Sequence, residues 1–123
     1  MQQDLFKGET GTRRLLFAFR HCLHGIAAAF RHEEAFRQES FLALILIPIA
    51  LLTEVGNLAK ALLIASVLLV LIVELLNSAI EAAVDRISLE DHHLAKRAKD
   101  IGSAAVLLSL VNGTVVWVLV LRG

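Results

Sequence analysis

The stretch ALLIASVLLVLIVELLNSAIEAAV, residues 61–84, decides how the chain folds, because an uncharged apolar run passes directly into a segment with carboxylates. Residues 61–73 carry no charged side chain, and Glu74 and Glu81 follow. A membrane-spanning helix needs about 20 mostly apolar residues, and this run reaches that length at about residue 80. We therefore expect a span over residues 58–84 that carries acidic side chains toward one end.

Two further apolar runs, FLALILIPIALL (41–52) and IGSAAVLLSLVNGTVVWVLVL (101–121), have the composition of membrane spans. The first is short, so its span is expected over 36–53, whereas the second fills a span over 101–121. Pro48 is tolerable in a membrane helix, where neighbouring groups satisfy the carbonyl that it frees. The chain is 57% hydrophobic and has a mean hydropathy of +0.70. This share of apolar residues is well above that of soluble domains. We predict an all-α membrane protein with a single domain over residues 1–123.

Lysine and arginine are distributed unevenly along the chain. Six lie in the N-terminal segment up to residue 37 and four lie between the second and third predicted spans: Lys7, Arg13, Arg14, Arg20, Arg31 and Arg37, then Arg86, Lys96, Arg97 and Lys99. Because such residues concentrate on the cytoplasmic side, we expect a cytoplasmic N-terminus, a cytoplasmic polar loop over 85–100 and an external C-terminus. Trp117 is expected to anchor the third span at the outer interface. Basic and acidic residues balance at 12 each, so no nucleic-acid partner is expected.

Residues 12–32 predict a different kind of helix. Apolar side chains recur at helical spacing from Leu15 to Phe30, and basic side chains from Arg13 to Arg31 gather on another face. An amphipathic helix that bears arginines tends to lie in the membrane interface. We therefore expect an N-terminal surface helix; the alternative is one helix of a soluble bundle.

The carboxylates that follow the central apolar run share one helical stripe. At about 100° per residue, Glu74, Ser78, Glu81 and Asp85 lie on one face, and Asn77 borders it. Glu74 lies about 20 Å along a span that begins near residue 60, which places it near the cytoplasmic edge. Carboxylates at such depth usually face a bundle interior or a water-filled cavity. A site is one interpretation, and simple pairing with Arg86, Lys99 or Arg37 is the other.

Two more polar clusters are expected at the same membrane face, RHEEAFRQE (31–39) and KRAKDIGS (96–103). Carboxylates together with lysine and arginine could hold a divalent metal ion and phosphates, because Mg²⁺ commonly uses one or two carboxylates plus phosphate oxygens. Phosphoryl transfer needs mainly positioning, charge neutralisation and a base. The sequence contains neither a GxxxxGK[ST] loop nor a kinase glycine-rich loop, so a nucleotide site would be of another type.

The strings ELLNSAIEAAVDRI (74–87), RAKDIGSAAV (97–106) and EAFRQE (34–39) resemble the prokaryotic diacylglycerol kinase family. The resemblance extends from about Arg14 to Leu121. It implies a homotrimeric bundle in which each chain has a surface helix and three transmembrane helices. It also implies transfer of the γ-phosphate of MgATP to diacylglycerol, giving phosphatidic acid, at active sites shared between neighbouring subunits on the cytoplasmic face.

The resemblance also implies roles for individual residues. Glu74 matches the catalytic base, and Glu33 and Glu81 match the Mg²⁺ ligands. Residues matching nucleotide contacts are Arg14, His21, Glu33, Glu81, Glu90, Asp91, His92, Lys99 and Asp100. Residues matching lipid contacts are Arg14, Ala35, Phe36, Arg37, Gln38, Glu39, Glu74 and Ser103. Asn77 and Asp85 match supporting positions of the same polar site.

Some positions depart from the family pattern. His21 and Asp91 stand where aromatic residues are expected near the nucleotide, and Glu34 is an extra carboxylate beside Glu33. A relative that phosphorylates undecaprenol shares the core string, although RQE (37–39) and GSAAV (102–106) favour the diacylglycerol type. A small proton or cation transporter built around Glu74, and a non-catalytic membrane scaffold, are the alternatives from other functional classes.

Overall fold

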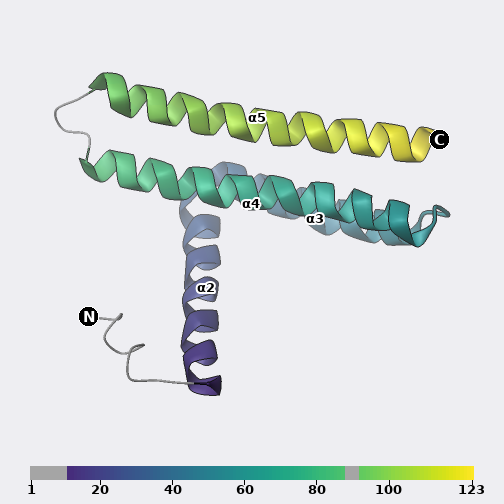
Figure 1. The fold of residues 1–123 in the computed structure, drawn as a ribbon, viewed down its shortest axis with the longest axis horizontal. Helices are drawn as coiled ribbons and strands as arrows, with labels where there is room; N and C mark the ends of the chain where they lie inside the picture. Colours follow the sequence, from purple (N-terminus) through teal and green to yellow (C-terminus); the bar gives the residue numbers. More distant parts are fainter. Residues whose placement is uncertain (1–10, 88–91) are drawn as a thin grey trace.

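The computed structural model describes residues 11–87 and 92–123, without the side chain of His92, and every regular element in these ranges is a helix. The helices are α2 (Thr12–His32), α3 (Glu34–Leu52), α4 (Asn57–Ile87) and α5 (His92–Arg122) (Figure 1). α3, α4 and α5 are each long and apolar enough to cross a membrane. The predictions of an all-α chain and of three candidate spans are confirmed.

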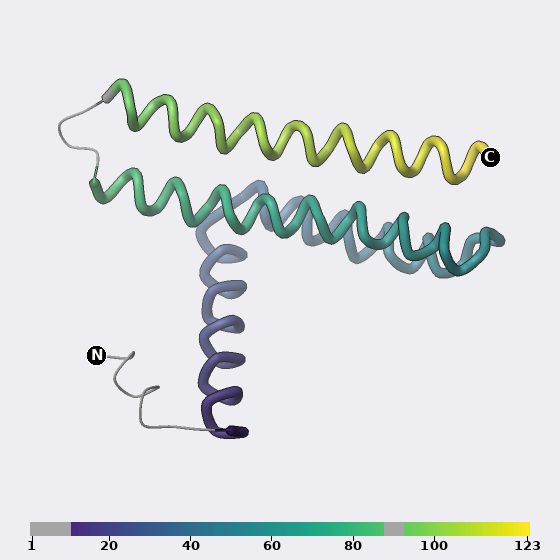
Figure 2. The backbone as a smooth tube through the Cα atoms, viewed as in Figure 1, coloured from purple at the N-terminus to yellow at the C-terminus, as the bar shows by residue number. Residues whose placement is uncertain are grey.

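The three candidate membrane spans, α3, α4 and α5, lie side by side, and α2 runs crosswise to them (Figure 1, Figure 2). α4 packs against both α3 and α5. Its buried residues are Leu63, Ser66, Val67, Val70 and Glu74, which recur at spacings of three and four and so form one stripe. Glu74 therefore continues the apolar stripe that holds the helices together.

Residues 85–100 were predicted to be a polar loop, and this is wrong for most of the segment. α4 continues to Ile87 and α5 begins at His92. Hydropathy marks where a chain leaves the membrane and does not mark where its helix ends. Alanine, lysine and arginine favour helix, and Lys96 Nζ donates to Asp100 Oδ2 one turn later at 2.7 Å. At 31 residues, α4 is about 46 Å long and exceeds the roughly 30 Å hydrocarbon layer.

The corner between α2 and α3 is fixed by specific contacts. Glu33 adopts an extended conformation (φ −114°, ψ 109°) that ends one helix before the next begins. Nη1 of Arg37 donates to the carbonyls of Phe30 at 2.9 Å and Arg31 at 3.0 Å, which caps the C-terminus of α2. The rings of Phe30 and Phe41 meet edge to face, with centroids 5.7 Å apart. These contacts hold α2 crosswise and keep Glu33 at the corner.

Candidate functional site

Glu74 is the buried acidic residue at the centre of the candidate site, with only 5% of its surface exposed. It lies on the face of α4 that packs against the neighbouring helices. A carboxylate in such a position is costly to bury and is usually retained for a function. Its placement agrees with the predicted stripe, on which Ser78 and Glu81 are half-buried and Asp85 is exposed.

Three other carboxylates act electrostatically on Glu74. Glu39 of α3 acts most strongly, followed by Glu33 at the α2–α3 corner and Glu81 two turns further along α4. We refer to these four residues as the acidic cluster. It brings together the predicted base and both predicted metal ligands. It also includes Glu39, which the sequence placed only among the lipid contacts.

Asn77 links the acidic cluster to α5. Its Nδ2 donates to Oε2 of Glu81 at 3.5 Å, a long hydrogen bond within α4. Its Oδ1 is buried and has no hydrogen-bond partner among the described residues. On the other side, Gly102 of α5 approaches this oxygen so closely that a Cβ at Gly102 would overlap it. The residue predicted as a supporting polar group therefore lies at the contact between two helices.

Asp85 and Lys99 join the ends of α4 and α5. Lys99 Nζ lies 2.6 Å from Asp85 Oδ1, and the two side chains are 43% and 63% exposed. Lys99 also interacts electrostatically with the carboxylate of Glu81. For Asp85, the structure thus shows the simple pairing that the sequence left open. Asp100, a predicted nucleotide contact, pairs along its own helix with Lys96.

Other predicted residues are not gathered around Glu74 by this single chain. Arg14 lies in the first turn of α2, at the end of that helix farthest from α3, α4 and α5 (Figure 1). His21 lies edge-on to His24, with ring centroids 6.4 Å apart. Phe36 is 4% exposed and belongs to the core.

The remaining predicted contacts divide into two groups. Three predicted lipid contacts, Ala35 and Gln38 of α3 and Ser103 of α5, are exposed. Glu90, Asp91 and the side chain of His92 lie outside the described part of the chain.

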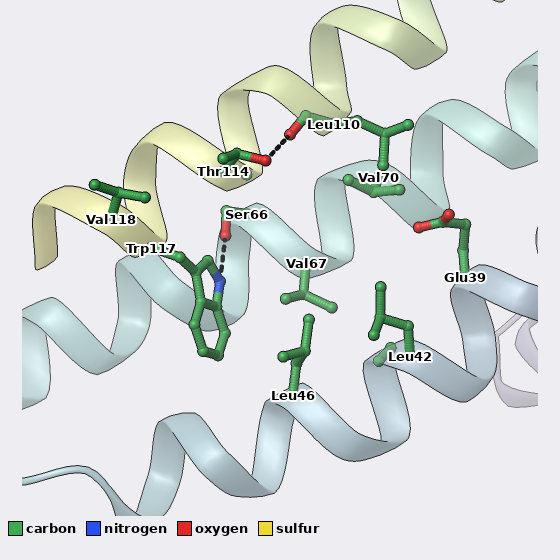
Figure 3. A pocket seen from close by; sticks show the side chains of 12 residues that line it. Glu39, Leu42, Leu46, Ser66, Val67, Val70, Leu110, Thr114, Trp117 and Val118 are labelled. Carbon is green, nitrogen blue, oxygen red and sulfur yellow. Dashed lines mark hydrogen bonds between the residues drawn. The ribbon is translucent and has the colours of Figure 1, made fainter. Parts of the chain in front are cut away.

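An apolar hollow of about 320 Å³ lies between α3, α4 and α5 (Figure 3). Glu39 lies at one end of it, and Trp117 lies toward the other (Figure 3). The indole Nε1 of Trp117 donates toward Ser66 Oγ at 3.1 Å and the Leu63 carbonyl at 3.2 Å. Sequence reasoning assigned Trp117 only to the outer interface, and the structure shows that its N–H joins α5 to α4.

The acidic cluster suits a metal ion that arrives with phosphates. Within residues 11–87 and 92–123, no three histidine, cysteine, aspartate or glutamate side chains are arranged to hold a metal by themselves. Mg²⁺ often takes one or two protein carboxylates and fills its remaining positions with water and phosphate oxygens. Glu33 and Glu81 are half-buried, so their carboxylates remain accessible for that role.

The chain is similar to known proteins over most of its length. The model of a family described as prokaryotic diacylglycerol kinase matches residues 20–121. The diacylglycerol kinase of Pseudomonas aeruginosa is 54% identical over 123 residues, which cover 100% of both chains. That of Escherichia coli K12 is 47% identical over 112 residues, 91% of this chain and 92% of the relative. That of Helicobacter pylori strain 26695 is 43% identical over 107 residues, 87% of this chain and 84% of the relative.

Proposed function

Because the chain belongs to the prokaryotic diacylglycerol kinase family, we propose that it transfers the γ-phosphate of MgATP to the hydroxyl of diacylglycerol, giving phosphatidic acid. The observation that carries this proposal is the acidic cluster around buried Glu74. Its two members on α4, Glu74 and Glu81, lie beyond residues 61–73, toward the end where α4 leaves the apolar region. The hydroxyl of diacylglycerol lies at a similar depth, near the headgroups.

Glu74 is proposed as the base. Its carboxylate accepts the proton of the lipid hydroxyl while that oxygen bonds to the γ-phosphorus and the bond to the bridging oxygen of ADP breaks. The proton then passes to water as the products leave. A base must lie within hydrogen-bond reach of the proton that it takes. The packing of α4 against its neighbours holds Glu74 in one place for this step.

Glu33 and Glu81 are proposed to hold the Mg²⁺ of MgATP. Bound there, the ion would supply positive charge that offsets the charge of the phosphates during transfer. Glu33 is positioned by the corner that Arg37 caps, and Glu81 accepts a hydrogen bond from Asn77. The corner thus places the backbone of Glu33, and the hydrogen bond from Asn77 orients the carboxylate of Glu81.

Lys99 is proposed to exchange its partner when the nucleotide binds. In the structure it pairs with Asp85, and both side chains are substantially exposed. An exposed pair of this kind contributes only about 0–1 kcal/mol, so replacing Asp85 by a phosphate costs little. Asp85 then serves to hold Lys99 beside the cluster between turnovers.

The active form is proposed to be a homotrimer with shared sites in the bacterial inner membrane. We place the N-terminus and the α4–α5 connection in the cytoplasm, the C-terminus outside, and α2 on the membrane surface. The distance of the first turn of α2 from α4 within one chain supports sharing, because a neighbouring chain would then supply Arg14 (Figure 2).

Mixed trimers test the shared site. Arg14→Ala and Glu74→Gln variants, each of low activity, are mixed in equal amounts before reassembly in micelles. If one site takes Arg14 from one subunit and Glu74 from the next, half times half of the sites are intact, so about a quarter of the activity returns in a cyclic trimer. No recovery, with subunit exchange verified by differently tagged chains, contradicts sharing.

The acceptor is tested directly with purified protein, MgATP and a panel of lipids. Phosphate transfer to diacylglycerol is expected to be faster than transfer to undecaprenol or to a lipid without a free hydroxyl. Faster turnover of undecaprenol would show that undecaprenol, and not diacylglycerol, is the preferred acceptor. Absence of any transfer in a folded preparation would contradict the kinase proposal.

A further inference from the structure

We propose that Gly102 is a positioning residue, which sets the amide of Asn77 and through it the carboxylate of Glu81. The proposal rests on the proposed function, because it takes Glu81 as a ligand of the Mg²⁺ that accompanies ATP. Sequence reasoning assigned Gly102 no role beyond its place in the GSAAV string. In the structure it is a buried glycine of α5 at the point where that helix meets Asn77 of α4.

The orientation of the Asn77 amide follows from the chemistry of its neighbours. An ionised carboxylate only accepts hydrogen bonds, so the NH₂ group of Asn77 must face Oε2 of Glu81. Oδ1 must then face α5, where it is buried without a hydrogen-bond partner among the described residues. Only the Cα–H of a glycine leaves room for it there. A weak Cα–H···O contact of this kind is the interaction that remains available to this oxygen.

A side chain at position 102 would disturb Asn77 before it disturbed the helices. The nearest atoms to a Cβ at Gly102 all belong to the Asn77 side chain, with Oδ1 overlapping and Cγ at 3.2 Å. The far end of a flexible side chain moves more easily than a packed backbone. The amide is therefore expected to rotate away, which breaks the hydrogen bond to Glu81 and releases that carboxylate.

The test compares Gly102→Ala with Gly113→Ala. Both glycines lie within α5, but nothing lies within 4 Å of a Cβ at Gly113. Partners that orient metal ligands typically contribute about 10- to 100-fold in metal affinity. Gly102→Ala is therefore expected to raise the Mg²⁺ concentration for half-maximal activity about tenfold, with an unchanged KM for diacylglycerol. Gly113→Ala is expected to leave both values unchanged. A normal Mg²⁺ response in Gly102→Ala overturns the proposal.

A double variant separates positioning from general packing. Asn77→Ala alone should raise the Mg²⁺ requirement as Gly102→Ala does, and the pair together should add nothing further. An equal additional loss from Gly102→Ala in the Asn77→Ala background would overturn the proposal. If Gly102→Ala alone fails to fold, the double variant must fold, because the obstructing amide is gone; failure of both overturns the proposal.

Binding of Mn²⁺ with ATP, followed by electron paramagnetic resonance, gives a readout that requires no turnover. The same pattern is expected among the variants: weaker binding in Gly102→Ala and no further weakening in the double variant. Loss of this pattern while the parent enzyme phosphorylates lipid overturns the positioning role alone. The pattern without any lipid phosphorylation overturns the proposed function alone.

Discussion

Replacing Glu74 by glutamine removes the proposed base and leaves nearly every other feature of the site in place. Glutamine has almost the same shape, so the 5% exposed position is refilled without a cavity. The substitution also removes the carboxylate on which the charges of Glu39, Glu33 and Glu81 act. The Glu74→Gln protein is therefore expected to have the same unfolding temperature as the parent protein, or a higher one. Loss of a general base typically costs about 10²- to 10⁴-fold in rate, which corresponds to about 2.7–5.4 kcal/mol in activation free energy.

The assay is transfer of labelled phosphate from MgATP to diacylglycerol in mixed micelles, with thermal unfolding measured on the same samples. Glu54→Gln is the matched control, because Glu54 is an exposed carboxylate in the turn between α3 and α4, outside the acidic cluster. We expect kcat to fall at least about 100-fold in Glu74→Gln and to remain unchanged in Glu54→Gln. A folded Glu74→Gln protein that keeps a tenth or more of the activity would refute the assignment of the base.

Three further outcomes are expected from other parts of the site. Glu33→Gln and Glu81→Gln should each raise the Mg²⁺ concentration for half-maximal activity about tenfold or more; a normal metal titration in both contradicts their role. Lys99→Met should raise the KM for MgATP about tenfold, because a charged hydrogen bond contributes about 1.5–3 kcal/mol, whereas Lys96→Met, which loses a pair within its own helix, should not. Equal effects of the two lysine variants would contradict a phosphate contact. Trp117→Phe removes the N–H that joins α5 to α4 and should lower the free energy of unfolding by about 1 kcal/mol without changing kcat, as measured by denaturant titration in micelles; unchanged stability contradicts that link.

Much of the fold could be predicted from the sequence. Hydropathy indicates which segments can cross the membrane, and helical spacing indicates which side chains share a face of a helix. The span expected over 58–84 corresponds to α4, and a helix was expected over 12–32, which are the bounds of α2. The polar segment 85–100 was misjudged because its charged residues exclude it from the membrane and yet favour helix. A pattern based on hydropathy cannot separate these two properties.

The site was predictable where its residues share a helix and was missed where two helices meet. Helical spacing alone placed Glu74 and Glu81 on one face of α4. The approach of Glu39 to Glu74 depends on the packing of α3 against α4, which no local pattern contains. The same holds for Gly102, whose role depends on the side chain that lies opposite. The available signal was a glycine within an otherwise helix-favouring string. This signal suggests a close contact between helices, but it does not indicate that Asn77 is the residue in contact.

The contrast between Glu74 and Asp85 explains why the proposed base is surrounded by carboxylates. Asp85 is held by Lys99, and a carboxylate in such an ion pair is occupied as a hydrogen-bond acceptor. Among the described residues, the charged neighbours that act on Glu74 are Glu39, Glu33 and Glu81, none of which can donate to it when ionised. We therefore expect its oxygens to remain available to a hydroxyl that approaches from the lipid. The same arrangement would repel a bare polyphosphate, since two like charges about 6 Å apart cost about 3 kcal/mol at an effective dielectric constant of about 20. A metal ion held by Glu33 and Glu81 would offset that repulsion, so we expect the proposed cluster to keep its base available and to admit the nucleotide only together with Mg²⁺.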